Sequence, residues 1–203
     1  MKILAASDIH ADLDAVEKLA KKAKEKNVDL VVLAGDLTVL GKGLEGLLKP
    51  LTNSKKKIAI IPGNHESEAD IFFLSKKYPD TLYNLHQYSF KVGDVGFFGC
   101  GLANIGPNEI SEDEVRSKIE RSFNYVKDAK RKVLVVHMPP YKTKLDTVGR
   151  NVNIGSKAVR EMIEKLRPDK CICGHVHETF GLEDKIGETE VFNVGPKGKI
   201  IYL

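Results

Sequence analysis

The chain has 203 residues, of which 42% are hydrophobic and 30% charged, enough to bury the core of one α/β domain or at most two small ones. Its formal net charge is only +4, and its lysines are mixed with acidic residues, so the concentrated basic surface of a nucleic-acid-binding protein is not expected. Three cysteines without a disulfide-like spacing, no signal-peptide pattern and no apolar run near the roughly 20 residues of a membrane span predict a soluble, cytoplasmic protein away from membranes. The oligomeric state does not follow from the sequence.

Strands and helices alternate in the first half of the chain. Short apolar runs predict strands at residues 2–6, 30–34 and 57–61, and helical spacing of apolar residues predicts helices at 12–26 and 67–77. Such β-α-β-α units imply a mostly parallel sheet with helices packed on it.

The second half is predicted to add a further set of strands and helices. A hairpin around Gly93-Asp94 is followed by a helix at 112–130, a strand at 133–136, a helix at 156–166 and strands at 170–173, 190–194 and 199–203. No linker, repeat or low-complexity segment divides the chain. We therefore expect a single domain over residues 1–203, with two packed sheets flanked by helices.

Polar residues capable of binding metal follow five of the predicted strands. They are Asp8 and His10, Asp36, Asn64 with His65, His137, and His175 with His177. Five of the six histidines belong to this set, and only His86 lies outside it. Because the carboxyl ends of parallel strands meet along one edge of a sheet, these residues are expected to converge.

The types and spacing of these residues indicate the class of metal. Asp8-x-His10 and His175-x-His177 place both members of each pair on one side of an extended backbone, and the neighbouring Gly35, Gly63 and Gly174 permit sharp turns. Imidazole and carboxylate ligands together suit Mn, Zn, Fe, Co or Ni rather than a purely Mg or Ca site. Seven candidate ligands exceed the needs of one tetrahedral ion, but they suit a pair of divalent ions roughly 3.5–4 Å apart.

The order Asp-x-His, Gly-Asp, Gly-Asn-His-Glu, His and Gly-His-x-His, running from Asp8 to His177, resembles the calcineurin-like metallophosphoesterase family. The resemblance implies a four-layer αββα sandwich with two mixed β-sheets flanked by helices. It also implies two metal sites and a catalytic histidine. One ion would be held by Asp8, His10 and His177, the other by Asn64, His137 and His175, with Asp36 as the bridge and His65 at the scissile phosphate, where it would protonate or stabilise the leaving oxygen.

The sequence departs from the protein-phosphatase branch of that family after Gly35-Asp36. The second Asp and the Arg of that branch are absent from the segment Leu37-Thr38-Val39-Leu40, which leaves open what orients His65. Glu66 and the segments around His137 and His175 look more like the small prokaryotic branch related to cyclic-nucleotide phosphodiesterases. The resulting hypothesis is a dinuclear phosphodiesterase that hydrolyses a small, nucleotide-like phosphodiester by attack of a metal-bridging hydroxide.

Several alternatives stay open at this stage. A metal-dependent nuclease and a non-catalytic scaffold protein would share the fold. Asn64 and His65 are candidate substrate contacts, and so is Arg150 in the polar loop 139–155, although a solvated loop fits Arg150 equally well. Asn64 also fits the role of a turn residue. The stretch 41–46 matches a dinucleotide fingerprint but is interpreted as a flexible loop, and Cys171 and Cys173 are interpreted as packing residues.

Overall fold

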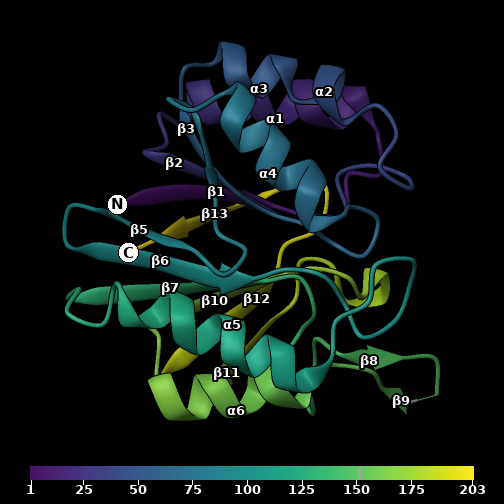
Figure 1. Ribbon diagram of the computed structural model, residues 1–203, viewed down its shortest axis with the longest axis vertical. Helices are drawn as coiled ribbons and strands as arrows, with labels where there is room; N and C mark the ends of the chain where they lie inside the picture. Colours follow the sequence, from purple (N-terminus) through teal and green to yellow (C-terminus); the bar gives the residue numbers. More distant parts are fainter. Residues whose placement is uncertain (151) are drawn as a thin grey trace.

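The computed structural model describes residues 1–150 and 152–203, without the side chain of Glu45, as four layers in which helices cover the outer faces of two sheets (Figure 1). The first sheet has the strand order β13 (Lys199–Tyr202), β1 (Lys2–Ala6), β2 (Leu30–Ala34), β3 (Lys57–Ile61) and β4 (Leu82–Asn84). The second has the order β11 (Glu183–Ile186), β12 (Thr189–Asn193), β10 (Lys170–Cys173), β7 (Arg131–Val136), β6 (Val95–Cys100) and β5 (Ser89–Val92). Both sheets are mixed, because β13, β11 and β5 run antiparallel to their neighbours.

The helices divide between the two outer faces. The first sheet is covered by α1 (Leu13–Glu25), α2 (Leu44–Leu47), α3 (Lys49–Asn53) and α4 (Glu68–Lys77). The second is covered by α5 (Glu112–Asn124) and α6 (Lys157–Leu166). A two-stranded ribbon of β8 (Thr147–Val148) and β9 (Val152–Asn153) projects from the main body.

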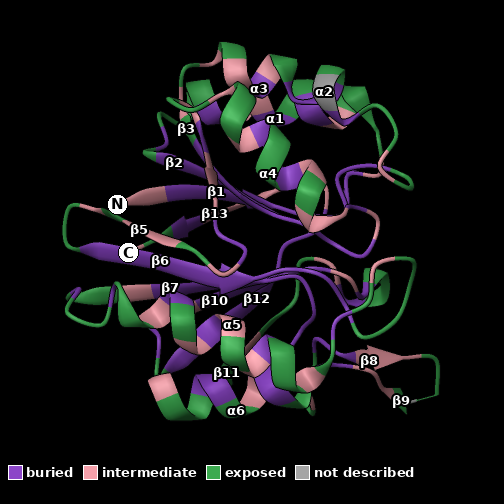
Figure 2. Ribbon diagram, in the orientation of Figure 1, coloured by how far each residue is buried: buried purple, intermediate pink, exposed green. Residues whose placement is uncertain are grey.

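Three apolar cores lie between the four layers, because successive residues of each central strand face opposite sides. In β1, Leu4 packs with the helices of the first sheet, whereas Ile3 and Ala5 pack against the second sheet. In β10, Cys171 and Cys173 pack under α5 and α6. The central strands are therefore buried on both faces, as their continuous apolar runs predict (Figure 2).

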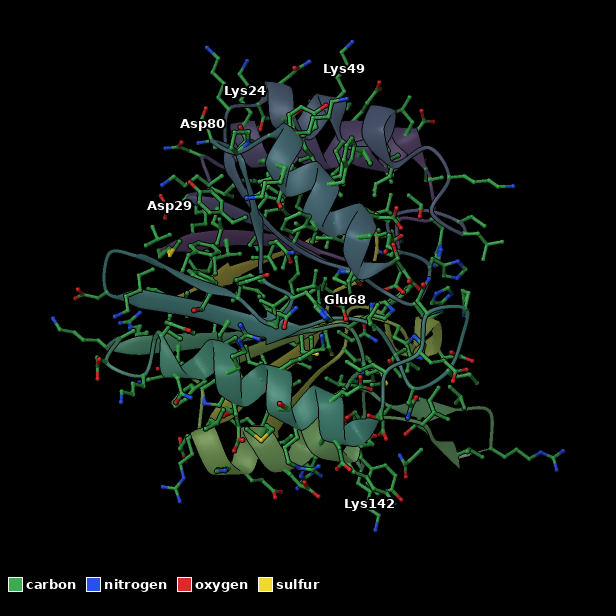
Figure 3. The ribbon with its side chains drawn as sticks, in the orientation of Figure 1. Lys24, Asp29, Lys49, Glu68, Asp80 and Lys142 are labelled. Carbon is green, nitrogen blue, oxygen red and sulfur yellow. The ribbon has the colours of Figure 1, made fainter. Side chains whose placement is uncertain are left out.

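All three cysteines are buried free thiols, which agrees with a packing role for Cys171 and Cys173. Burial raises the pKa of Cys171 well above that of an ordinary thiol. Among the helices of the described chain, none has the length and apolar character needed to cross a bilayer. In Figure 3 the labelled Lys24, Lys49, Asp80 and Lys142 project outward from the layers, whereas Glu68 lies at the start of α4, near the middle of the view.

The fold confirms the predicted four-layer sandwich but corrects several elements. The helix predicted at 112–130 ends at Asn124, because Val126 turns inward against β6, where a Cβ atom on Gly96 would lie only 2.6 Å from that of Val126. The 41–46 stretch is not entirely a loop, since α2 begins at Leu44. The loop 139–155 contains the β8–β9 ribbon, and α3, β4 and β11 were not predicted.

Candidate metal centre

Every sequence-predicted ligand lies at the sheet edge where the parallel strands end, opposite the chain termini (Figure 1). Three groups of ligand atoms, each within 4.8 Å of one another, are formed by Asp8, His10 and His177, by His10, Asp36 and His65, and by Asp36, His137 and His175. His10 and Asp36 each belong to two groups, so the clusters are continuous.

The backbone at this edge adopts positive φ values, which residues other than glycine rarely have. Asp8, His10, Asp36 and His175 have φ values of 54°, 48°, 52° and 72°. Each such residue costs on the order of 1–3 kcal/mol, and strained residues of this kind concentrate at functional sites. Four of the seven candidate ligands therefore occupy strained backbone positions around one centre.

Two glycines allow the loops to approach the carboxylates closely. A Cβ atom on Gly63 would lie 2.1 Å from Asp36 Oδ1, and one on Gly174 would lie 2.4 Å from Asp8 Oδ2. The closeness also lets backbone groups fix the carboxylates: His65 N–H donates to Asp36 Oδ1 at 2.9 Å, and His175 N–H donates to Asp8 Oδ2 at 3.0 Å. The lack of a side chain at these two glycines is therefore what lets the loops lie against the carboxylates.

At one end of the centre, Nε2 of His137 faces the oxygen atoms of two other candidate ligands. Nδ1 of the same ring lies 2.8 Å from Ala34 O, and a carbonyl can only accept, so Nδ1 donates and Nε2 is the nitrogen left to bind an ion. Nε2 lies 3.2 Å from Asn64 Oδ1 and 3.3 Å from Asp36 Oδ2. His175 Nδ1 lies 3.1 Å from the same Asn64 oxygen. Acceptors converge here, and a second nitrogen bonded to a backbone carbonyl is typical of metal-ligating histidines.

At the other end, two imidazoles and a carboxylate face one another. Nε2 of His10 and Nε2 of His177 are 3.3 Å apart, and His177 Nε2 lies 3.5 Å from Asp8 Oδ1. Asp8 is buried, whereas the His177 side chain is 57% exposed, so this end opens to solvent. A ligand can therefore reach the centre from this side.

The two carboxylates dominate the electrostatics of the centre. Burial by itself lowers the pKa of His137, but Asp36 and Asp8 outweigh burial and raise that pKa to about 9. Burial opposes the ionisation of Asp36, yet His137 holds the pKa of the Asp36 carboxyl well below its usual range. Burial, with the positive charge of His137, lowers the pKa of His175 to about 4. The carboxylates thus attract positive charge strongly enough to keep a proton on a buried imidazole.

These observations test whether divalent ions fit the residues. The donor set of imidazole nitrogens, carboxylates and one amide oxygen matches transition-metal ions, and the described ion pairs of Asp8 and Asp36 involve histidines rather than lysine or arginine. Asp36 shares one ligand group with His10 and another with His137, as a bridging carboxylate would. The residues fit a two-ion centre.

His65 lies beside the ligands with its ring held by the main chain. Leu40 N–H donates to His65 Nδ1 at 3.3 Å, and the ring packs edge-on against His10 with centroids 5.0 Å apart. Sequence reasoning did not find this support. It also missed the hydrogen bond between the side chains of Thr38 and Glu66, although the position of Glu66 directly after His65 was a usable signal.

Two other loops complete the surroundings. Asn108, which was not predicted, donates from its backbone and its side chain to Asn64 O at 3.2 and 3.0 Å and so steadies the Asn64 loop. Arg150 is exposed in the turn between β8 and β9, and the described hydrogen bonds and ion pairs do not join it to the metal-binding side chains. The ribbon is held instead by buried Asp146, which accepts from Thr143 N–H at 2.9 Å and from Asn153 Nδ2 at 2.8 Å.

The family model of the calcineurin-like phosphoesterases matches residues 1–179, and the chain belongs to this family. The uncharacterized protein MJ1162 of Methanocaldococcus jannaschii is 33% identical over 211 residues, which cover 100% of this chain and 91% of that protein. The family membership agrees with the resemblance seen in the five motifs.

Solved structures share the fold at low sequence identity. The protein TT1561 of Thermus thermophilus has a TM-score of 0.77 at 19% identity, covering 97% of this chain and 90% of its own. A dimetal phosphatase from Danio rerio has a TM-score of 0.66 at 13% identity, covering 97% and 88%. An archaeal phosphodiesterase has a TM-score of 0.58 at 20% identity, covering 96% and 84%. At these identities the similarity shows the architecture alone.

Proposed function

We propose that this protein is a dinuclear-metal phosphodiesterase that hydrolyses a small, nucleotide-like phosphodiester. The observation that carries the proposal is the convergence of two buried carboxylates, four imidazoles and one amide oxygen at a single sheet edge, in a chain of the calcineurin-like phosphoesterase family. The proposal treats residues 1–203 as one catalytic domain, since the ligands come from strands of both sheets.

The proposed ligand sets follow the two ends of the centre. Asp8, His10 and His177 would hold one ion, Asn64, His137 and His175 the other, and Asp36 would bridge them. When bound, two divalent ions of the Mn, Zn, Fe, Co or Ni type supply an activated water and neutralise charge on the phosphate.

The residues of the chain would orient the substrate. Asn64 and His65 lie beside each other after β3 and can donate hydrogen bonds from Nδ2 and Nε2 to phosphate oxygens. His65, outside both ligand sets, would act at the leaving oxygen. Arg150 remains a proposed contact for a more distant anionic group of the substrate. Cytoplasmic action is part of the proposal and is supported by the three free thiols.

The direct test is hydrolysis by the purified protein loaded with Mn²⁺ or Zn²⁺. We expect release of p-nitrophenol from bis-p-nitrophenyl phosphate at a higher kcat/KM than from the monoester, and loss of release after chelation. Absence of hydrolysis of both compounds by protein with two bound ions per chain would contradict the enzymatic proposal. Degradation of single-stranded DNA at a higher kcat/KM than the small diester would identify a nuclease instead.

A matched pair of variants ties that activity to the centre. His65→Ala is expected to lower kcat by about 100-fold, the lower range for loss of a general acid–base group, while both ions stay bound. His86→Gln, a substitution at the histidine outside the centre, is expected to leave kcat unchanged. Equal effects of the two substitutions would show that His65 has no specific part in the reaction.

A further inference from the structure

A strained turn follows β2 and faces His65. Lys42 N–H donates to Val39 O at 3.3 Å, and the two residues between them, Leu40 and Gly41, have φ values of 54° and 72°. Two consecutive positive φ values are characteristic of a type I′ turn, in which leucine is disfavoured. Leu40 is 57% exposed, so packing of its side chain does not explain why it occupies this position.

The main chain of this turn fixes the imidazole of His65. The amide of Leu40 can only donate, so its bond of 3.3 Å makes His65 Nδ1 the acceptor. In the neutral ring the proton then lies on Nε2, which can donate to an oxygen of the substrate. The second aspartate of the protein-phosphatase branch is absent after Asp36. In its place, the strained Leu40 amide orients the ring of His65.

Thr38 holds this turn in place. Its hydroxyl donates to Glu66 Oε1 at 2.7 Å and accepts from Gly41 N–H at 3.1 Å. One side chain therefore joins the turn that carries the Leu40 amide to the segment that carries His65.

Glu66 completes the connection as a buried carboxylate with donors on both oxygens. It is 0% exposed and accepts from Thr38 N–H at 2.8 Å on Oε1 and from Gly63 N–H at 3.0 Å on Oε2. A single carboxylate thereby joins the loop after β2 to the loop after β3. Buried polar networks with satisfied partners hold loops rigidly, which is what a catalytic side chain needs from its supports.

We propose that Thr38 and Glu66 are positioning residues for His65 and act through the Leu40 amide. The inference rests on the proposed phosphodiesterase function and extends it to the support of the catalytic histidine. Its consequence is that His65 meets the leaving oxygen as a hydrogen-bond donor through Nε2–H. The benefit to the reaction is then greatest for substrates whose leaving group is a poor one.

The kinetic test uses Thr38→Val, which keeps the side-chain shape and removes the hydroxyl. On a series of aryl phosphodiesters we expect kcat to fall on the order of tenfold for the least acidic leaving groups, a size typical of losing a partner outside the metal shell. The fall is expected to be smaller for acidic leaving groups, with KM nearly unchanged. Thr38→Ser keeps the hydroxyl and is expected to have the kcat of the wild type. Thr189→Val is the control at a distant site, because it removes the hydroxyl of a buried threonine that is bonded to Pro168 O.

A double-mutant cycle separates positioning from general loosening of the fold. If Thr38 acts through His65, Thr38→Val has no further effect on kcat in a His65→Ala background. An equal fall of kcat in both backgrounds, or equal falls for all leaving groups, would overturn the proposal.

A second readout does not depend on activity. In the Zn²⁺-loaded protein with ¹⁵N-labelled histidine, NMR is expected to show His65 with an unprotonated Nδ1 and a protonated Nε2, and a mixture of the two forms in Thr38→Val. A wild-type His65 with its proton on Nδ1 would overturn the inference. Should the protein hydrolyse no phosphodiester, the proposed function fails, while the NMR result still decides how His65 is held.

Discussion

Two buried histidines, His86 and His137, each face a carboxylate with Nε2, but their Nδ1 atoms have opposite hydrogen-bonding roles. His86 Nδ1 accepts from Gly101 N–H at 3.0 Å, so its Nε2 bears the proton and lies 3.1 Å from Glu68 Oε1, though without hydrogen-bonding geometry. His137 Nδ1 donates to Ala34 O, so its Nε2 is the nitrogen that faces Asp36 Oδ2, at 3.3 Å. The main chain therefore fixes Nδ1 as an acceptor in His86 and as a donor in His137.

The two clusters also differ in the group that supplies positive charge to the carboxylate. Glu68, the first residue of α4, receives Lys118 Nζ from α5 at 2.9 Å. Burial lowers the pKa of His86 to about 4, with Glu68 opposing and Lys118 adding to the effect. At His137 the carboxylates raise the pKa to about 9 instead. The first cluster receives positive charge from its own lysine, whereas the carboxylates of the second raise the pKa of a buried imidazole and so favour a cation at that position.

The largest expected difference between the clusters is in activity. Asp36→Asn removes the proposed bridge and is expected to lower kcat/KM by more than about 100-fold, because partners outside the metal shell alone cost about 10- to 100-fold. Glu68→Gln, the matched change in the other cluster, is expected to stay within twofold of wild type. Steady-state kinetics on bis-p-nitrophenyl phosphate measures both values. A larger loss of kcat/KM in Glu68→Gln than in Asp36→Asn would show that the catalytic centre lies at the His86 cluster.

The next difference is in stabilisation by metal. Mn²⁺ or Zn²⁺ at 100 times its Kd is expected to raise the free energy of unfolding by about 2.7 kcal/mol in the wild type. The increase should persist in His86→Gln and shrink in His175→Gln. Denaturant unfolding with and without the ion gives the values. If the metal-dependent stabilisation disappeared in His86→Gln alone, the ion would bind at the His86–Glu68 cluster, which would contradict the proposal.

A smaller effect concerns stability against pH. The pKa of His86 is about 4 in the folded chain against an ordinary value of 6.5, so the unfolded chain binds more protons between these values. Stability is therefore lost as pH falls through this window, by about 2 kcal/mol between pH 7.5 and 5. We expect this loss in the wild type relative to His86→Gln, measured by urea unfolding at each pH. Equal pH profiles for the two proteins would show that His86 is not held neutral by its surroundings.

The smallest effect is expected at Arg150, which lies outside both clusters. Its exposed guanidinium would contribute an attraction typical of a surface ion pair, so Arg150→Ala is expected to raise KM by about two- to fivefold. Because such binding is equal in the ground and transition states, kcat should not change. An unchanged KM would remove Arg150 from the substrate contacts.

The sequence was sufficient to predict the candidate centre because its ligands follow strand ends, and strand ends follow from apolar runs. Asp8 and His177 are far apart in sequence, yet the parallel arrangement of the strands brings them within 3.5 Å. The four-layer fold could be predicted for the same reason, since central strands buried on both faces require helices outside both sheets.

The support of His65 could not be predicted, because it depends on contacts between loops. The bond from Leu40 exists only where a strained turn after β2 meets the loop after β3, and no periodicity encodes that meeting. The end of α5 was misplaced for a similar reason. Its helical pattern continues past Asn124, but the packing of Val126 against Gly96 ends the helix.

The most direct test of the two-ion centre is anomalous X-ray scattering from crystals of the protein loaded with Mn²⁺. We expect two peaks roughly 3.5–4 Å apart, the spacing of paired catalytic ions, on either side of Asp36 and none beside His86. A single peak at the centre, peaks beside Glu68, or no peak in crystals whose bound Mn²⁺ is measured independently would contradict a dinuclear site.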